Sequence, residues 1–67
     1  MQISGRNKLF GEIVEIKLGG VVSEVTIQVG ENQIAGVITT TSVENMELAI
    51  GDRVTALIKA TEVSFIK

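Results

Sequence analysis

Apolar and polar side chains alternate along most of this 67-residue chain, and strict alternation is typical of β-strands. Residues 9–18 form the first predicted strand, in which Phe10, Val14 and Ile16 share one face. Residues 21–29 form the second and alternate between β-branched and polar side chains. The Gly19-Gly20 pair between them suits a two-residue hairpin turn, because glycine adopts positive φ without a Cβ clash.

The rest of the pattern predicts a third strand, a short helix and two further strands, at residues 33–39, 41–50, 53–59 and 61–66. The helix prediction depends on Thr41 and Glu44, which have the spacing of a capping box, and Gly51-Asp52 is expected to end it. This order of elements matches an OB-type barrel. We therefore expect an all-β fold over residues 1–67 as one domain: an OB-type five-stranded Greek-key barrel with one short helix between strands 3 and 4.

The composition adds an expectation about assembly. The chain is 45% apolar, with a mean hydropathy of +0.39, and contains neither Cys nor His. A domain this small has a marginal core and usually needs a disulfide, a metal or a partner subunit. Since the first two are largely ruled out, a homo-oligomer is expected. No apolar run approaches the roughly 20 residues that span a bilayer, so we expect a cytoplasmic protein without membrane contact.

The inventory of reactive side chains argues against catalysis. His, Cys, Tyr and Trp are all missing, so the usual proton shuttle and activated thiol are absent, and we expect no enzyme, no cofactor and no metal coordinated directly by protein. Nucleic-acid binding, which many OB barrels perform, needs a basic groove and stacking aromatics. Here the net charge is −2, the basic residues are scattered, and Phe10 and Phe65 lie at positions that suit a core.

Small polar and cationic side chains occur in three places that could together bind an oxyanion. Hydroxyl groups at a helix start, an Arg and a Lys would supply donors and positive charge to a tetrahedral dianion. The candidate residues are Ser4, Arg6, Thr39, Ser42, Lys59 and Ala60. The alternative is that the hydroxyls only cap a helix, that the first residues are a frayed terminus, and that the lysine covers a strand end. Composition leaves both interpretations open.

Three segments resemble the molbindins, free-standing forms of a molybdate-binding OB-type module. The resemblance covers residues 3–11, 36–43 and 48–63, with an S-x-R-N opening, an I-T-x-x-S centre and a K-A-[ST]-x-V ending, in order and at compatible spacing. It implies a homohexamer, a trimer of dimers, that stores or buffers molybdate and tungstate at sites between subunits.

The same resemblance implies roles for the candidate residues. Ser4 and Arg6 match the N-terminal ligand groups, Thr39 and Ser42 the hydroxyl donors. Lys59 matches the basic closing element together with Ala60, which stands where some members carry Ser, so one hydroxyl donor could be lost there. Two other functions remain as alternatives: a ligand-free oligomerisation module and an OB-type nucleic-acid binder.

Overall fold

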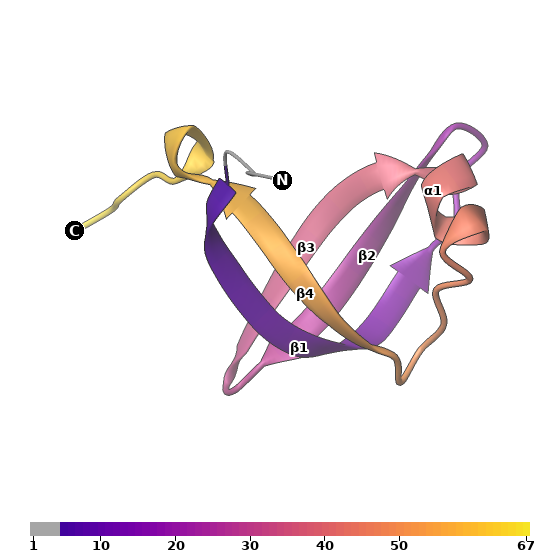
Figure 1. Ribbon diagram of the computed structural model, residues 1–67, viewed down its shortest axis with the longest axis horizontal. Helices are drawn as coiled ribbons and strands as arrows, with labels where there is room; N and C mark the ends of the chain where they lie inside the picture. The colour runs from indigo at the N-terminus through magenta and orange to yellow at the C-terminus, as the bar shows by residue number, and fades with distance from the viewer. Residues whose placement is uncertain (1–4) are drawn as a thin grey trace.

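A four-stranded antiparallel sheet curls around one side of the molecule, with a short helix at one end (Figure 1). The computed structural model describes residues 5–67, with side chains from Asn7 onward. The elements in chain order are β1 (Gly5–Lys17), β2 (Val22–Val29), β3 (Asn32–Thr39), α1 (Thr40–Asn45), β4 (Arg53–Lys59) and a 3₁₀ turn, η1 (Ala60–Glu62). The strand order across the sheet is β3-β2-β1-β4. The all-β class, the OB-type fold and the place of the helix are therefore confirmed.

Strand β1 is long enough to belong to two ladders. Its first half pairs with β4, with Lys8 opposite Leu57, and its second half pairs with β2, with Ile13 opposite Ile27. The register shifts after Ile13, which is the signature of a β-bulge, and bulges sharpen the local bend of a strand. Near this bend, a Cβ on Gly11 would lie 2.6 Å from the Gln28 carbonyl oxygen. The missing side chain at Gly11 is what allows β1 to cross β2 so closely.

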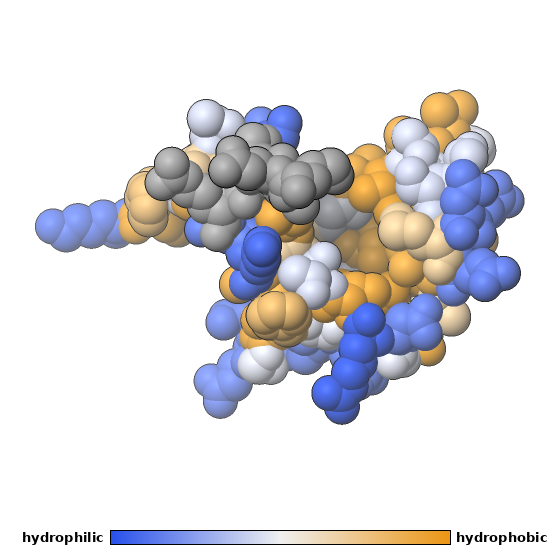
Figure 2. Space-filling model, in the orientation of Figure 1, coloured by the Kyte–Doolittle hydropathy of each residue, from blue (hydrophilic) through white to orange (hydrophobic). Residues whose placement is uncertain are grey.

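The inner face of the curled sheet carries the core, but the core is only partly closed. Ile13 is fully buried, Ile27 is 4% exposed, and Val43 of α1 is 5% exposed. Most other apolar residues of this face remain half-buried. Figure 2 shows them as an apolar hollow that opens between the two arms of the sheet.

The predicted fifth strand at residues 61–66 is wrong: within this chain no such strand forms. After β4 the backbone makes the single turn η1 and then runs away from the sheet as an extended segment (Figure 1). Phe65 is 92% exposed and Phe10 74% exposed, so the expectation that both belong to the core is also wrong. The alternation showed only that these residues suit a strand, because a period-two pattern does not say which sheet supplies the neighbour.

The predicted helix cap is displaced by two residues. Thr39, not Thr41, is the N-cap, and its Oγ1 accepts a hydrogen bond of 3.1 Å from the Ser42 N–H. Glu44 therefore lies beyond the position from which it could complete the box. The ladder with β2 runs to Thr39, and the Thr40 N–H donates to the Val21 carbonyl, so the sheet fixes where the helix begins.

The helix also ends earlier than predicted, at Asn45 rather than before Gly51-Asp52. The N–H groups of Glu47 and Leu48 donate to the carbonyls of Glu44 and Val43, the paired bonds of a Schellman motif. This motif requires positive φ at its penultimate position, and Glu47 has φ 53°. An L side chain in this region costs about 1 kcal/mol or more, which explains why glycine is the usual residue there.

We expect Glu47→Gly to stabilise the fold by about 1 kcal/mol, since glycine adopts the required φ without the Cβ clash. The measurement is urea unfolding followed by far-UV circular dichroism. Glu47→Ala is the matched control, because it removes the same carboxylate but keeps the Cβ. An equal increase in the free energy of unfolding of both variants would show that loss of the Glu47 charge, and not relief of backbone strain, stabilises the fold.

Candidate functional site

The start of α1 holds two of the predicted oxyanion ligands in direct contact. The Oγ atoms of Thr39 and Ser42 lie 2.7 Å apart, and Thr39 Oγ1 also accepts from the Ser42 N–H. Because two hydroxyls share one hydrogen bond, one O–H proton remains free to donate outward. The N–H of Thr41 has no acceptor among residues 5–67. This corner of the molecule therefore has at least two hydrogen-bond donors that the described residues leave unused.

Thr40 is not among the predicted ligands, but it positions this corner. Its Oγ1 donates to the Gly19 carbonyl over 2.8 Å and lies 2.7 Å from Oγ of Ser23. Ser23 is 2% exposed, so this network ties the start of the helix to the turn between β1 and β2. The sequence did contain a signal for this network: Ser23 is a polar residue at one of the otherwise apolar positions of the strand predicted at residues 21–29. The Thr40 hydroxyl already donates its proton to the Gly19 carbonyl. Thr40 therefore orients the neighbouring donors and is not itself a free donor.

The remaining predicted ligands gather where β1 begins and β4 ends. Lys59 is the last residue of β4, its backbone pairs with Gly5, and Ala60 follows as the first residue of η1. The exposed Lys59 ammonium forms no hydrogen bond or ion pair with the side chains described from Asn7 onward. The register shift between Gly5 and Asn7 makes Arg6 the extra residue of a bulge, while its side chain lies outside the described part. The prediction for Ser4 lies outside the described residues altogether.

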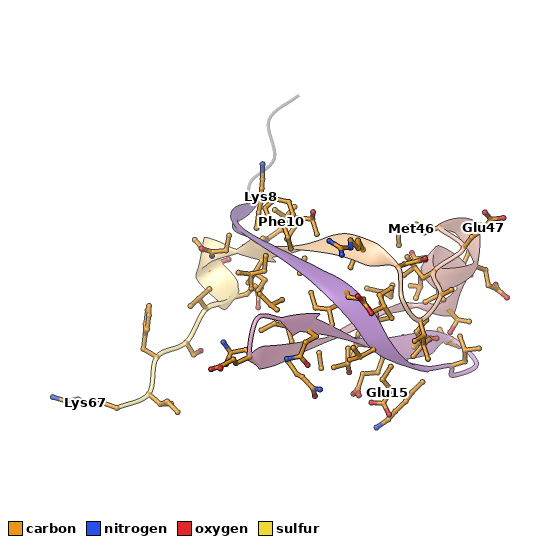
Figure 3. The ribbon with its side chains drawn as sticks, turned by 90° about the horizontal axis from the view of Figure 1, so that it is seen from below. Lys8, Phe10, Glu15, Met46, Glu47 and Lys67 are labelled. Carbon is orange, nitrogen blue, oxygen red and sulfur yellow. The ribbon has the colours of Figure 1, made fainter. Side chains whose placement is uncertain are left out.

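One chain does not bring all these groups together. The end of β3 and the start of α1, which hold Thr39 and Ser42, lie at one end of the sheet, and the end of β4, which holds Lys59, lies at the opposite end (Figure 1). Figure 3 shows the same separation from another side: Lys8 and Phe10 mark the β4 end, and Met46 and Glu47 mark the helix end. The single chain thus carries these predicted ligands in two separate groups, which we call the hydroxyl half-site (Thr39, Ser42) and the cationic half-site (Lys59, Ala60).

Two hollows on the described part of the chain show how far a single copy could enclose a ligand. A shallow hollow of about 570 Å³ opens along the outer side of β1 and β4. A second, of about 380 Å³, lies between β1 and the loop that follows α1. None of the four residues of the half-sites lines either hollow. A ligand held by both half-sites would therefore have to be enclosed by more than one copy of the chain.

Two further properties bear on the kind of site. Among the side chains that the structure describes, no group of three or more metal-ligating residues is close enough to hold a metal ion. The helices of the described region are too short and too polar to cross a bilayer. What the surface offers is hydroxyl, amide and ammonium donors, the groups that bind an oxyanion through hydrogen bonds and charge.

This chain is similar to known sequences over nearly its full length. The TOBE domain family matches residues 3–65. Molybdenum-pterin-binding protein 1 of Clostridium pasteurianum is 41% identical over 64 residues, which cover 94% of both chains. The molybdenum transport protein ModE of Azotobacter vinelandii is 48% identical over 64 residues; these cover 94% of this chain, which spans only 24% of ModE.

Solved structures show the same fold. A molybdate-binding protein from Sporomusa ovata superposes with a TM-score of 0.94 over 100% of both chains, at 42% identity. The cytoplasmic molybdate-binding protein ModG, crystallised with molybdate bound, has a TM-score of 0.83 and 39% identity, over 90% of this chain and 43% of ModG. With a family match over residues 3–65 and a relative that is 41% identical over 94% of both chains, this chain belongs to the TOBE domain family, together with the molybdenum-pterin-binding proteins.

Proposed function

We propose that this protein binds molybdate, and also tungstate, at sites formed between copies of the chain. The observation that carries the proposal is the match to a molybdenum-pterin-binding protein along 94% of both chains, which leaves no other domain to supply the relative's function. The described surface supports it with free donors at the hydroxyl half-site and an unpaired ammonium at the cationic half-site.

The proposed binding is an equilibrium without covalent chemistry. Hydroxyl and amide donors, the Lys59 ammonium and the Arg6 guanidinium replace the water shell of a tetrahedral dianion, and Ser4 adds a further hydroxyl. Hydrogen bonds to charged groups contribute about 1.5–3 kcal/mol each, so a few suffice for tight binding. Ala60 contributes only a backbone amide.

The separation of the half-sites supports an assembly. Since Thr39 and Lys59 lie at opposite ends of one sheet, the hydroxyl half-site of one copy meets the cationic half-site of another in our proposal. A closed ring of such contacts gives a symmetric homo-oligomer, for which we propose a hexamer built as a trimer of dimers. Such an assembly loads and releases anions by mass action, which suits storage or buffering in the cytoplasm.

Selectivity follows from the type and spacing of the donors. Sulfate is a smaller dianion and leaves some donors unpaired, while protonated phosphate presents a donor to a site that itself consists of donors. Tungstate has nearly the size and charge of molybdate. We therefore expect molybdate and tungstate to bind similarly and the other two anions to bind weakly.

Calorimetric titration with molybdate, tungstate, sulfate and phosphate tests the function. The first two should bind and raise the unfolding temperature, because a ligand at 100 times its Kd stabilises the bound state by about 2.7 kcal/mol. Ser42→Ala should weaken molybdate binding about tenfold or more, since it removes a hydroxyl donor without removing the Thr39 cap.

Thr41→Ala is the matched control: it deletes an exposed neighbouring hydroxyl that forms no hydrogen bond among the described residues. Equal heats for all four anions, or none, would refute the proposal. Equal heats would mean unselective anion binding, and no heat would mean an oligomerisation module without a ligand.

A further inference from the structure

A closed ring of hydrogen bonds joins the start of α1 to the turn between β1 and β2, which lie side by side in Figure 1. The Gly19 N–H donates to Ser23 Oγ over 3.3 Å, and Thr40 Oγ1 donates to the Gly19 carbonyl over 2.8 Å. The two hydroxyl oxygens lie 2.7 Å apart. A hydroxyl has one proton, and that of Thr40 is already used, so Ser23 is the donor between them. The ring therefore begins and ends at Gly19.

Both hydroxyls of the ring are fully used inside the fold. Each donates one hydrogen bond and accepts one, and Ser23 is 2% exposed. Hydrogen bonds arranged head to tail polarise one another, which strengthens each of them. Neither hydroxyl is therefore available to a ligand. The ring can act on the oxyanion site only by fixing the position of other groups.

The turn that the ring holds has little else to fix it. The β1–β2 ladder ends at the pair Lys17 and Glu24, so the turn lies beyond the backbone pairing of these two strands. Leu18 and Val21 are 69% and 78% exposed, so packing of their side chains contributes little. A Cβ at Gly20 would meet nothing within 4 Å, and two glycines in a row leave the backbone free to adopt many conformations. Hydrogen bonds, rather than packing, hold this turn against the helix.

Thr40 transmits the constraint to the hydroxyl half-site. It follows the N-cap Thr39 directly, and its own N–H donates to the Val21 carbonyl over 2.9 Å. The turn and the residues next to it therefore hold both the side chain and the backbone of Thr40. Ser42 lies two residues further on in the same helical turn, with its hydroxyl 2.7 Å from that of Thr39. A shift of Thr40 would move both of these donors.

We infer that Ser23 and Thr40 are positioning residues that make the oxyanion site selective for the size of its ion. Molybdate and sulfate carry the same charge, and sulfate is the smaller ion. A site separates two such ions only where its donors cannot close around the smaller one, which requires donors held in place by a second layer of contacts. The ring supplies that layer for the hydroxyl half-site. This inference rests on the proposed function and adds to it the part of the fold that governs selectivity.

Titration with molybdate, alone and in competition with sulfate, tests the inference in the full chain. The double variant Ser23→Ala/Thr40→Val removes both hydroxyls at nearly constant side-chain volume, which costs far less than leaving one of them without its partner. Its ratio of sulfate Kd to molybdate Kd should fall about fivefold or more, the effect of one net hydrogen bond. Thr40→Ser keeps the proton that closes the ring, so it should keep the wild-type ratio.

Thr26→Val is the matched control. It removes a buried hydroxyl from the same strand as Ser23, and among the described residues that hydroxyl forms no hydrogen bond with α1 or with the turn. Urea unfolding gives the stability of each variant. A fall in the ratio that came only from a weaker fold would appear in Thr26→Val as well, and an equal fall in both would overturn the inference.

Amide hydrogen exchange without any anion gives a second readout. In the double variant the Ser42 N–H, which donates to Thr39 Oγ1, should exchange faster than in the wild type, because the start of α1 is less constrained. If the double variant does not fold, Ser23→Ala alone opens the ring and should show the same two changes with smaller size. Unchanged exchange at Ser42 overturns the positioning role.

The outcomes separate this inference from the function on which it rests. A wild-type chain that binds no molybdate refutes the proposed function, and the selectivity inference with it. A wild-type chain that prefers molybdate over sulfate, with the same preference in the double variant, overturns the inference alone. A reduced preference in the double variant, kept by Thr40→Ser and Thr26→Val, supports both.

Discussion

Replacing Lys59 by Met should weaken molybdate binding about 30-fold or more while leaving the free energy of unfolding almost unchanged. The ammonium at the end of β4 forms no bond with the side chains described, so the fold loses little when it is removed. In the proposed site it interacts with a dianion away from bulk water. A lost charge-assisted hydrogen bond of about 2 kcal/mol corresponds to that factor. Calorimetry measures the affinity and urea unfolding the stability.

Lys8→Met is the matched control for this experiment. Lys8 lies on β1 opposite Leu57, near Lys59, and its exposed side chain is not among the predicted ligands. The substitution Lys8→Met removes the same charge from the same end of the sheet as Lys59→Met. Because a surface charge is screened by salt, its loss should change the affinity for molybdate only slightly. Equal losses in both variants would mean that net charge, rather than direct contact with Lys59, governs binding. A Lys59→Met protein that unfolds would make this lysine structural.

Replacing Gly11 by Ala should destabilise the fold by about 2–3 kcal/mol or more, a large effect for so small a domain. The new Cβ would lie 2.6 Å from the Gln28 carbonyl oxygen and 2.9 Å from Cγ2 of Val29. The closer neighbour is backbone within the β1–β2 ladder, so it cannot rotate away as a side chain would. Either the strands separate or β1 loses its bend. Urea unfolding and amide hydrogen exchange would report the loss.

Gly20→Ala is the control with the same change of residue. Gly20 lies in the turn between β1 and β2, has no positive φ, and would place its Cβ in open space. Its replacement should leave stability unchanged or raise it slightly, because alanine restricts the unfolded chain. Similar unfolding curves for the two alanine variants would show that the close approach at Gly11 is relaxed in solution.

The candidate site could be predicted from the sequence only in part. The motif spacing identified Thr39 and Ser42 as neighbours, and their hydroxyls are indeed 2.7 Å apart. It did not predict that Lys59 lies beside the start of the chain, where the ladder pairs it with Gly5. What the motifs could not show is that these groups form two half-sites at opposite ends of one sheet. Order along the chain carries no information about distance across a fold.

Local preferences in the sequence were sufficient for three of the strands of this protein, because alternation, turn glycines and hydroxyl caps act over a few residues, whereas β1 begins at Gly5, four residues before its predicted start. They determined β2, β3 and β4 to within a residue of the observed bounds, and the presence of a helix between β3 and β4. The tertiary structure alone decided the rest. The β2 ladder chose Thr39 rather than Thr41 as the cap, and the bend at Gly11 gave β1 two partners. The segment after Glu62 runs clear of its own sheet, since whether a strand-like sequence pairs depends on which edge it can reach.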